Sequence, residues 1–154
     1  MKFIPVQPTR REALSLAAIA GLAAILAPKM SLADEGMVAA EIKKLFGDRK
    51  IDSGKIKLDV PEIAENGLVV PINVEVESPM TDKDYVKTVH VFADGNPLPG
   101  VVSYRFTPSS GKAAASTRMR LAQTQNIVAI AEMSNGNLYS TKSNIKVTIG
   151  GCGG

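Results

Sequence analysis

An alternation of apolar and polar residues with a period of two begins after Gly47, and it constrains the fold more than any other feature of the chain. In residues 72–77 and again in 145–149, every second residue is Ile or Val and the residues between them are polar. Successive side chains of a β-strand point to opposite faces, so each run has one buried face and one solvated face. The pattern therefore predicts sheets that bury one face in a common core.

Turn-forming clusters divide this region into seven candidate strands. Clusters rich in Gly, Pro, Asn, Asp and Ser separate them, and Asn135-Gly136 is a strong hairpin signal. Short strands with closely spaced turns favour an all-β fold, an immunoglobulin-like antiparallel β-sandwich. Pro71 lies within one strand and predicts an edge or a bulge there. The candidate strands are Lys55–Val60, Leu68–Glu77, Tyr85–Ala93, Val101–Thr107, Ala113–Ala122, Ile127–Met133 and Leu138–Ile149.

A short helix is expected ahead of the strands, over Gly36–Phe46. Its apolar residues fall on one helical stripe, and Gly47 follows as a plausible C-terminal stop. The stripe is narrow, so we expect the helix to lie against the sandwich edge or a partner. The stripe consists of Val38, Ile42, Leu45 and Phe46.

Residues 1–33 have the features of an export signal. Arg10 and Arg11 precede an apolar run, 13–27, that is shorter than the about 20 residues of a typical membrane span. Ser31-Leu32-Ala33 is a small-x-small cleavage site, so the mature chain is expected to begin at Asp34, with no membrane segment after cleavage. A retained membrane anchor is the alternative. The paired arginines indicate the twin-arginine route and a periplasmic location, although Ala13 and Ser15 depart from the usual pattern.

Charge and cysteine content exclude several classes of function. The chain has 18 Lys and Arg against 15 Asp and Glu, and the excess of +3 lies within residues 1–33, which hold four basic residues and one acidic residue. The remainder is neutral, which argues against nucleic-acid binding. One Cys and one His leave no disulfide framework and no ordinary transition-metal site, and no cofactor motif is present. Residues 34–149 are expected to form one domain.

The common enzyme motifs are missing, and the remaining candidate groups have simpler interpretations. There is no G-x-S-x-G, no phosphate-binding glycine loop, no H-E-x-x-H and no C-x-x-C. His90 lies within a strand, with no Cys or Ser near it in sequence, and is interpreted as structural. The run 82–84, Asp-Lys-Asp, is interpreted as a solvated turn. Arg118 and Arg120 share a strand face and could hold an anion, but an exposed sandwich face is the favoured interpretation.

The last five residues are the candidate site. Gly150, Gly151, Gly153 and Gly154 surround Cys152, the chain's single cysteine. We find no packing requirement for these glycines in the sequence, so we expect residues 150–154 to form a loose exposed arm with a reach of about 10 Å from the last strand. An accessible thiol without an activating cation favours a covalent carrier over an enzyme. The alternatives are an exported interaction module linked by an intermolecular Cys152 disulfide, which would give a homodimer, and an incidental cysteine.

The segment 147–154 resembles the end of the SoxY family, the sulfur carriers of the bacterial thiosulfate-oxidising (Sox) system. The glycine-flanked cysteine is the specific signal, and the twin-arginine-like leader agrees with it. Supporting similarity extends over most of the chain after residue 33. The other matching segments are 61–67, 78–81, 84–87, 116–122 and 129–134.

The resemblance implies an immunoglobulin-like sandwich that forms a heterodimer with a second sandwich protein, SoxZ. It implies that Cys152 is the covalent attachment site and that a haem enzyme, SoxXA, couples thiosulfate to it to give a cysteine S-thiosulfonate. It further implies that SoxB removes sulfate by hydrolysis and that a sulfur dehydrogenase acts later in many organisms. Such a protein is a substrate-carrier subunit with no cofactor of its own.

Overall fold

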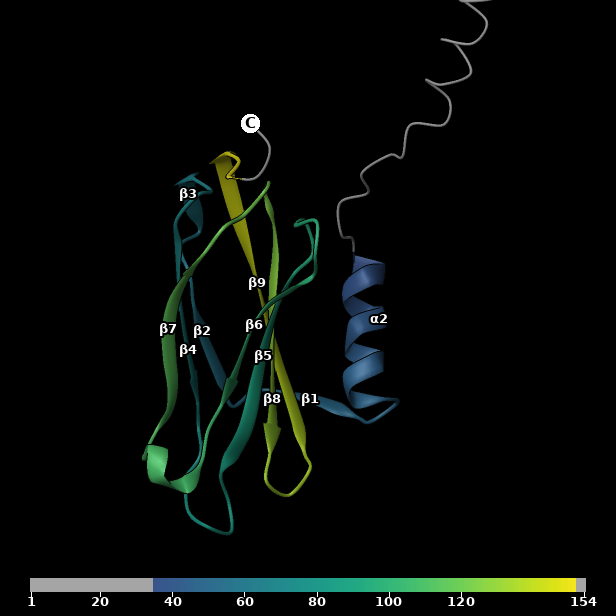
Figure 1. Ribbon diagram of the computed structural model, residues 1–154, viewed down its shortest axis with the longest axis vertical. Helices are drawn as coiled ribbons and strands as arrows, with labels where there is room; N and C mark the ends of the chain where they lie inside the picture. The colour runs from purple at the N-terminus through teal and green to yellow at the C-terminus, as the bar shows by residue number, and fades with distance from the viewer. Residues whose placement is uncertain (1–34, 152–154) are drawn as a thin grey trace, which may run out of the picture. The chain divides into compact units, whose positions relative to one another are not determined.

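The computed structural model describes residues 35–151, which form one α-helix, one short 3-10 helix and nine strands, the strands in two facing sheets (Figure 1). The expected signal segment 1–33, Asp34 and the last three residues lie outside this range. No helix within 35–151 is long and apolar enough to cross a membrane.

The larger sheet contains six strands. Its main path runs β1 (Ile51–Ser53), β9 (Leu138–Ile149), β8 (Gln125–Met133), β5 (Val86–Ala93) and β6 (Gly100–Arg105). β8 lies antiparallel to both β9 and β5, and β6 lies antiparallel to β5. β1 and β3 (Ile63–Asn66) both pair in parallel with β9, β1 along its first half and β3 along its second. The strand β9 is therefore long enough to hold two short strands along one edge.

The smaller sheet contains β2 (Ile56–Asp59), β4 (Val70–Val76) and β7 (Ala113–Met119), all antiparallel, with β4 in the middle. A single-turn 3-10 helix, η1 (Pro108–Ser110), precedes β7. Pro71 is paired with Arg118 of β7, whereas β2 reaches only as far as Asn73. β4 is therefore the central strand of this sheet and not an edge strand. At Pro71, however, β4 is paired only with β7, so the missing proline N–H removes no hydrogen bond to β2.

The core lies between the two sheets and follows the period-two pattern. In β4, Val70, Ile72, Val74 and Val76 are buried and the residues between them are exposed. β5 and β8 are buried on both faces over much of their length, because the larger sheet is covered on its outer side as well.

The helix α2 (Glu35–Phe46) covers that outer side and forms a second, smaller core (Figure 1). Val38 and Phe46 are buried there against Phe92, Ile130 and Leu138 of the larger sheet. The helix ends where predicted, because Gly47 adopts a φ of +65° and its amide donates to the Lys43 carbonyl at 2.8 Å.

Two expectations about the helix need correction. It packs on the face of the larger sheet and not at the sandwich edge. Leu45, expected on the buried stripe, is 44% exposed. A helix turns 100° per residue, so Val38, Ile42 and Phe46 lie within about 80° of one another around the helix. Leu45 lies about 60° from the centre of that stripe, at its margin, and is left partly in solvent.

The β-sandwich and all seven predicted strands are confirmed. The sequence did not predict β1 and β3, which have three and four residues, or their parallel pairing. Strands this short show no recognisable alternation, and the neighbour that stabilises them, β9, is far away in sequence.

Candidate functional site

The predicted site follows β9, whose end lies beside β3 at one end of the sandwich (Figure 1). Gly150 and Gly151 are described by the structure. Cys152, Gly153 and Gly154 lie outside the described residues, so their predicted roles remain predictions.

Three backbone segments meet at this end, at Gly67, Leu121 and Gly151. The Gly67 amide donates to the Ile149 carbonyl at 2.7 Å, and the Gly67 carbonyl accepts from the Leu121 amide at 2.8 Å. The Leu121 carbonyl in turn accepts from the Gly151 amide at 2.8 Å. We call Gly67, Leu121, Ala122, Gly150 and Gly151 the junction.

Glycine is required at three junction positions because the backbones approach so closely. A Cβ on Gly150 would overlap the Ala122 carbonyl oxygen, and one on Gly151 would overlap the Gly67 carbonyl group. A Cβ on Gly67 would overlap the Leu121 carbonyl oxygen and lie 2.8 Å from the Gly151 nitrogen. Real Cβ atoms do not make such contacts, so a side chain at any of these positions would force the backbones apart.

The structure therefore differs from the expected loose arm at Gly150 and Gly151. Both residues are held against the domain by the junction, and the interpretation that no packing requires these glycines is wrong for them. Gly67 is the residue through which the sequence could have pointed to this packing, since the structure buries it directly after β3. The residues that it contacts are 54 or more positions away in the sequence, and the contacts were not predicted. Cys152 follows directly after the fixed Gly151.

A network of polar side chains supports the junction from the β5–β6 loop. The Asn96 side chain accepts from the Ala122 amide at 3.0 Å and donates to the Arg120 carbonyl at 2.9 Å. Gln125, only 3% exposed, donates to Asn96 at 2.9 Å and accepts from the Gly95 amide at 2.8 Å. This loop thus holds the chain on both sides of Leu121. From the sequence alone, Asn96 is interpreted only as a turn former, and Gln125 is not singled out.

His90 forms a side-chain pair that the sequence did not reveal. Its Nδ1 lies 2.7 Å from the Oγ of Ser103, the residue opposite it on β6. The ring also packs edge-on against Phe46, with centroids 5.5 Å apart. Partial burial lowers the pKa of His90, and the Glu132 carboxylate only partly opposes this.

A serine–histidine pair can belong to a nucleophilic site, but the surroundings here favour the structural role. Glu132, the carboxylate that acts on His90, is engaged by Arg49 at 3.0 Å. His90 lies between Phe46 and Phe92 under the helix, which is the environment of a packing residue. The interpretation of His90 as structural agrees with this arrangement.

The other predicted candidates lie where the simpler interpretations placed them. The Asp82–Asp84 run is a turn, in which Thr81 and Asp84 exchange backbone hydrogen bonds. Arg118 and Arg120 are both exposed, at and just beyond the end of β7. Among residues 35–151, no group of three or more His, Cys, Asp or Glu side chains could hold a metal ion.

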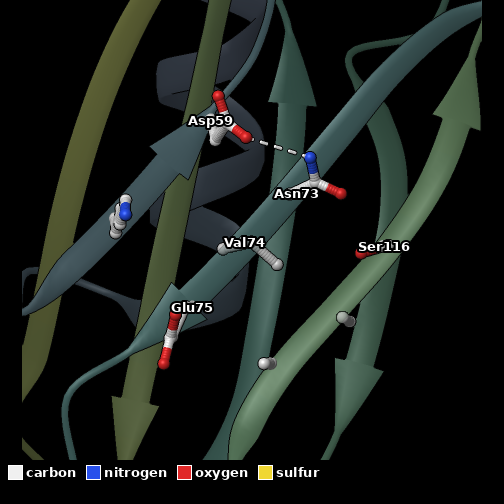
Figure 2. Close-up of a pocket in the computed structure, with 8 residues that line it drawn as sticks. Asp59, Asn73, Val74, Glu75 and Ser116 are labelled. Carbon is white, nitrogen blue, oxygen red and sulfur yellow. Dashed lines mark hydrogen bonds between the residues drawn. The ribbon is translucent and has the colours of Figure 1, made fainter.

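A shallow hollow of about 300 Å³ lies on the outer face of the smaller sheet (Figure 2). It exists because Ala114 and Ser116 of β7 are small beside the longer side chains of β2 and β4. Asp59 accepts a hydrogen bond from the Asn73 amide at 3.1 Å across it. Its charges are mixed, and it has none of the residues predicted to carry chemistry.

Fold and site together define a class: a small β-sandwich in which the candidate reactive residue follows a glycine junction at one end of the domain. The family model of the sulfur oxidation protein SoxY matches residues 42–152, which includes both the junction and Cys152. The chain belongs to the SoxY family.

Similar solved structures agree. The sulfur carrier protein SoxY from Chlorobium limicola f thiosulfatophilum is 34% identical, with a TM-score of 0.62 over 74% of this chain and 98% of that one. The superoxide reductase (neelaredoxin) from Ignicoccus hospitalis is 15% identical, with a TM-score of 0.56 over 77% of this chain and 95% of that one. The superoxide reductase from Nanoarchaeum equitans is 14% identical, with a TM-score of 0.53 over 62% and 99%. The two reductases show a shared fold alone. No curated protein matches the sequence.

Proposed function

We propose that this protein is a covalent carrier of sulfur intermediates in periplasmic thiosulfate oxidation, with Cys152 as the attachment site. Membership of the SoxY family supports a carrier role in sulfur oxidation. The observation that supports the site is the junction, which holds Gly151 at the end of the sandwich, one residue before the single cysteine.

The chemistry balances as an oxidation followed by a hydrolysis. The Cys152 sulfur forms a bond to the outer sulfur of thiosulfate, and the thiol proton and two electrons leave, the electrons to a haem enzyme of the SoxXA type. Water then attacks the sulfonate sulfur of the adduct, so that the terminal sulfur–sulfur bond breaks. Sulfate and two protons are released, and a persulfide anion remains on Cys152. A sulfur dehydrogenase could oxidise that remaining sulfur.

The carrier does not need acid–base groups of its own, because partner enzymes supply them. No described side chain forms a catalytic constellation next to the junction, whose hydrogen bonds among residues 35–151 are with backbone groups and with the side-chain amide of Asn96, itself held by Gln125. The proposed partners are a SoxZ-like subunit, which completes a heterodimer, and transiently the haem enzyme and a SoxB-like hydrolase.

Export by the twin-arginine route completes the proposal. Protein isolated from the periplasm should begin at or within a few residues of Asp34, and replacing Arg10 and Arg11 by Lys should leave the precursor in the cytoplasm. Periplasmic protein that begins at Met1 would contradict cleavage, and unchanged export of the double-Lys variant would point to the general secretory route.

The carrier function is tested by loading the protein with thiosulfate in the presence of the haem enzyme and measuring its intact mass. A carrier gains about 112 Da, the mass of thiosulfate after two-electron coupling to a thiol, and loses it again with a thiol reductant. A protein whose function is a structural disulfide instead gains no adduct and runs as a covalent dimer that reductant separates.

A further inference from the structure

The junction limits how far Cys152 can extend from the domain. Gly151 is held by a hydrogen bond to Leu121 and is packed against Gly67, so the position of the chain is fixed as far as Gly151. Consecutive Cα atoms lie about 3.8 Å apart, so the Cα of Cys152 remains within about 3.8 Å of the Gly151 Cα. An enzyme that acts on the Cys152 sulfur must therefore bring its own surface against this end of the sandwich.

The surface that such an enzyme meets has exposed apolar side chains. Leu68 and Val69 directly follow Gly67 of the junction and are 46% and 60% exposed. Ile149, the last residue of β9, is 66% exposed. Large aliphatic side chains gain free energy when they are buried against another protein. Three of them exposed next to the junction form an apolar patch of the kind that marks interaction sites.

This end of the sandwich carries few charges. The segments 66–74, 121–131 and 147–151, which run from the junction, contain no Lys, Arg, Asp or Glu, although 21% of the whole chain is charged. The charged residues that directly precede these segments are of mixed sign: Glu65, Arg120 and Lys146. The adjoining β5–β6 loop is likewise uncharged from Gly95 to Tyr104. The surface therefore offers a partner apolar contacts and backbone groups, and little electrostatic attraction.

From this arrangement we propose that Leu68, Val69 and Ile149 form a docking surface for the enzymes that load and process Cys152. The occupant is a protein with an uncharged, apolar rim around the cleft that receives the cysteine. Because Cys152 directly follows the fixed Gly151, an enzyme that reaches its sulfur must also contact this end of the sandwich. Because few charges lie there, we expect that contact to be mainly apolar. This inference rests on the proposed carrier function.

The test measures kcat/KM for thiosulfate loading of the full-length mature protein, in complex with its SoxZ-like partner, by the haem enzyme. The test protein is a double variant that carries both Leu68→Ser and Val69→Ser. The matched control is Leu45→Ser, because Leu45 lies on the helix and is exposed to nearly the same extent as Leu68 (44%). The double variant should lose about tenfold in kcat/KM, as expected for truncated interface anchors, and the control should stay within about twofold. Leu68→Met should retain most of the rate.

Two further readouts separate docking from other causes. Reaction of Cys152 with a small aromatic disulfide reagent should be the same in all variants, since that reagent needs no docking. Raising the salt from about 0.02 M to about 0.5 M should change kcat/KM of the wild type by less than about threefold, because electrostatically steered association would fall by tenfold or more.

Several results would overturn the inference. They are equal loading of the double variant and the wild type, an equal loss in Leu45→Ser, a change in small-reagent reactivity that accounts for the loss, and a steep fall with salt. A reductant-resistant dimer that the double variant abolishes would assign the surface to a second copy of the chain instead. If the wild type gains no adduct at all, the proposed function itself has failed, which is a distinct outcome.

Discussion

The amide of Gly151 donates a hydrogen bond to the carbonyl oxygen of Leu121, 2.8 Å away, and this bond fixes the chain one residue before Cys152. The Leu121 amide is held in turn by the Gly67 carbonyl. The candidate attachment site is therefore not at the end of a long tether. It is joined to a backbone arrangement that only glycine permits at three positions.

Gly67→Ala should destabilise the domain. Its new Cβ would overlap the Leu121 carbonyl oxygen, and because Gly67 lies in mid-chain it cannot swing away, so we expect a loss of about 1–3 kcal/mol in the free energy of unfolding. Chemical denaturation measures it. Gly100→Ala is the control, since a Cβ there meets nothing within 4 Å, and it should change stability by no more than about 0.5 kcal/mol.

Gly151→Ala should act locally, in contrast to Gly67→Ala. The segment can detach from the junction, so the cost is limited to one or two hydrogen bonds, about 0.5–1.5 kcal/mol each, and the melting temperature should move little. Hydrogen exchange at residue 151 should become fast, and the Leu121 amide should remain protected by the Gly67 carbonyl. Slow exchange at residue 151 in the variant would contradict the junction.

His90 should make the stability depend on pH. Burial lowers its pKa in the folded state, so the unfolded chain takes up the proton first as the pH falls through about 6.5. The free energy of unfolding should therefore decrease as the pH falls from about 7 to about 5. Denaturation at several pH values should show this slope in the wild type and a smaller one in His90→Gln. An equal slope in both proteins would assign the effect to carboxylates.

Phe46 should anchor the helix to the sheet. It is 5% exposed and belongs to the second core with Val38 and Phe92, so Phe46→Ala should cost about 3 kcal/mol or more. Leu45→Ala, one residue earlier and 44% exposed, should remain within about 0.5 kcal/mol of the wild type. Similar losses in both variants would mean that the helix packs differently from the arrangement in Figure 1.

The sequence predicted those features that depend on local pattern. β9 begins and ends at the predicted residues, Leu138 and Ile149, and the alternation of β4 buries the predicted face. The helix and its stop at Gly47 are also correct. Each of these depends on residues within about a dozen positions of one another.

Contacts between distant segments could not be predicted in the same way. The junction joins Gly67, Leu121 and Gly151, and nothing local to any of them shows that their backbones touch. The pair His90 and Ser103 is 13 residues apart and depends on the register of β5 against β6. Gly150 and Gly151 were therefore interpreted from composition alone, as flexible, whereas close packing explains why they are glycine.

The most direct test of the carrier proposal compares the intact mass of the mature protein with that of Cys152→Ser, each incubated with thiosulfate and the haem enzyme. We expect the wild type to gain about 112 Da and the Ser variant to gain nothing, while the variant keeps its melting temperature and still binds the proposed SoxZ-like partner. Thiosulfate-dependent electron transfer should disappear with the adduct. An adduct on the Ser variant, or undiminished electron transfer without Cys152, would contradict the proposal that this cysteine is the attachment site.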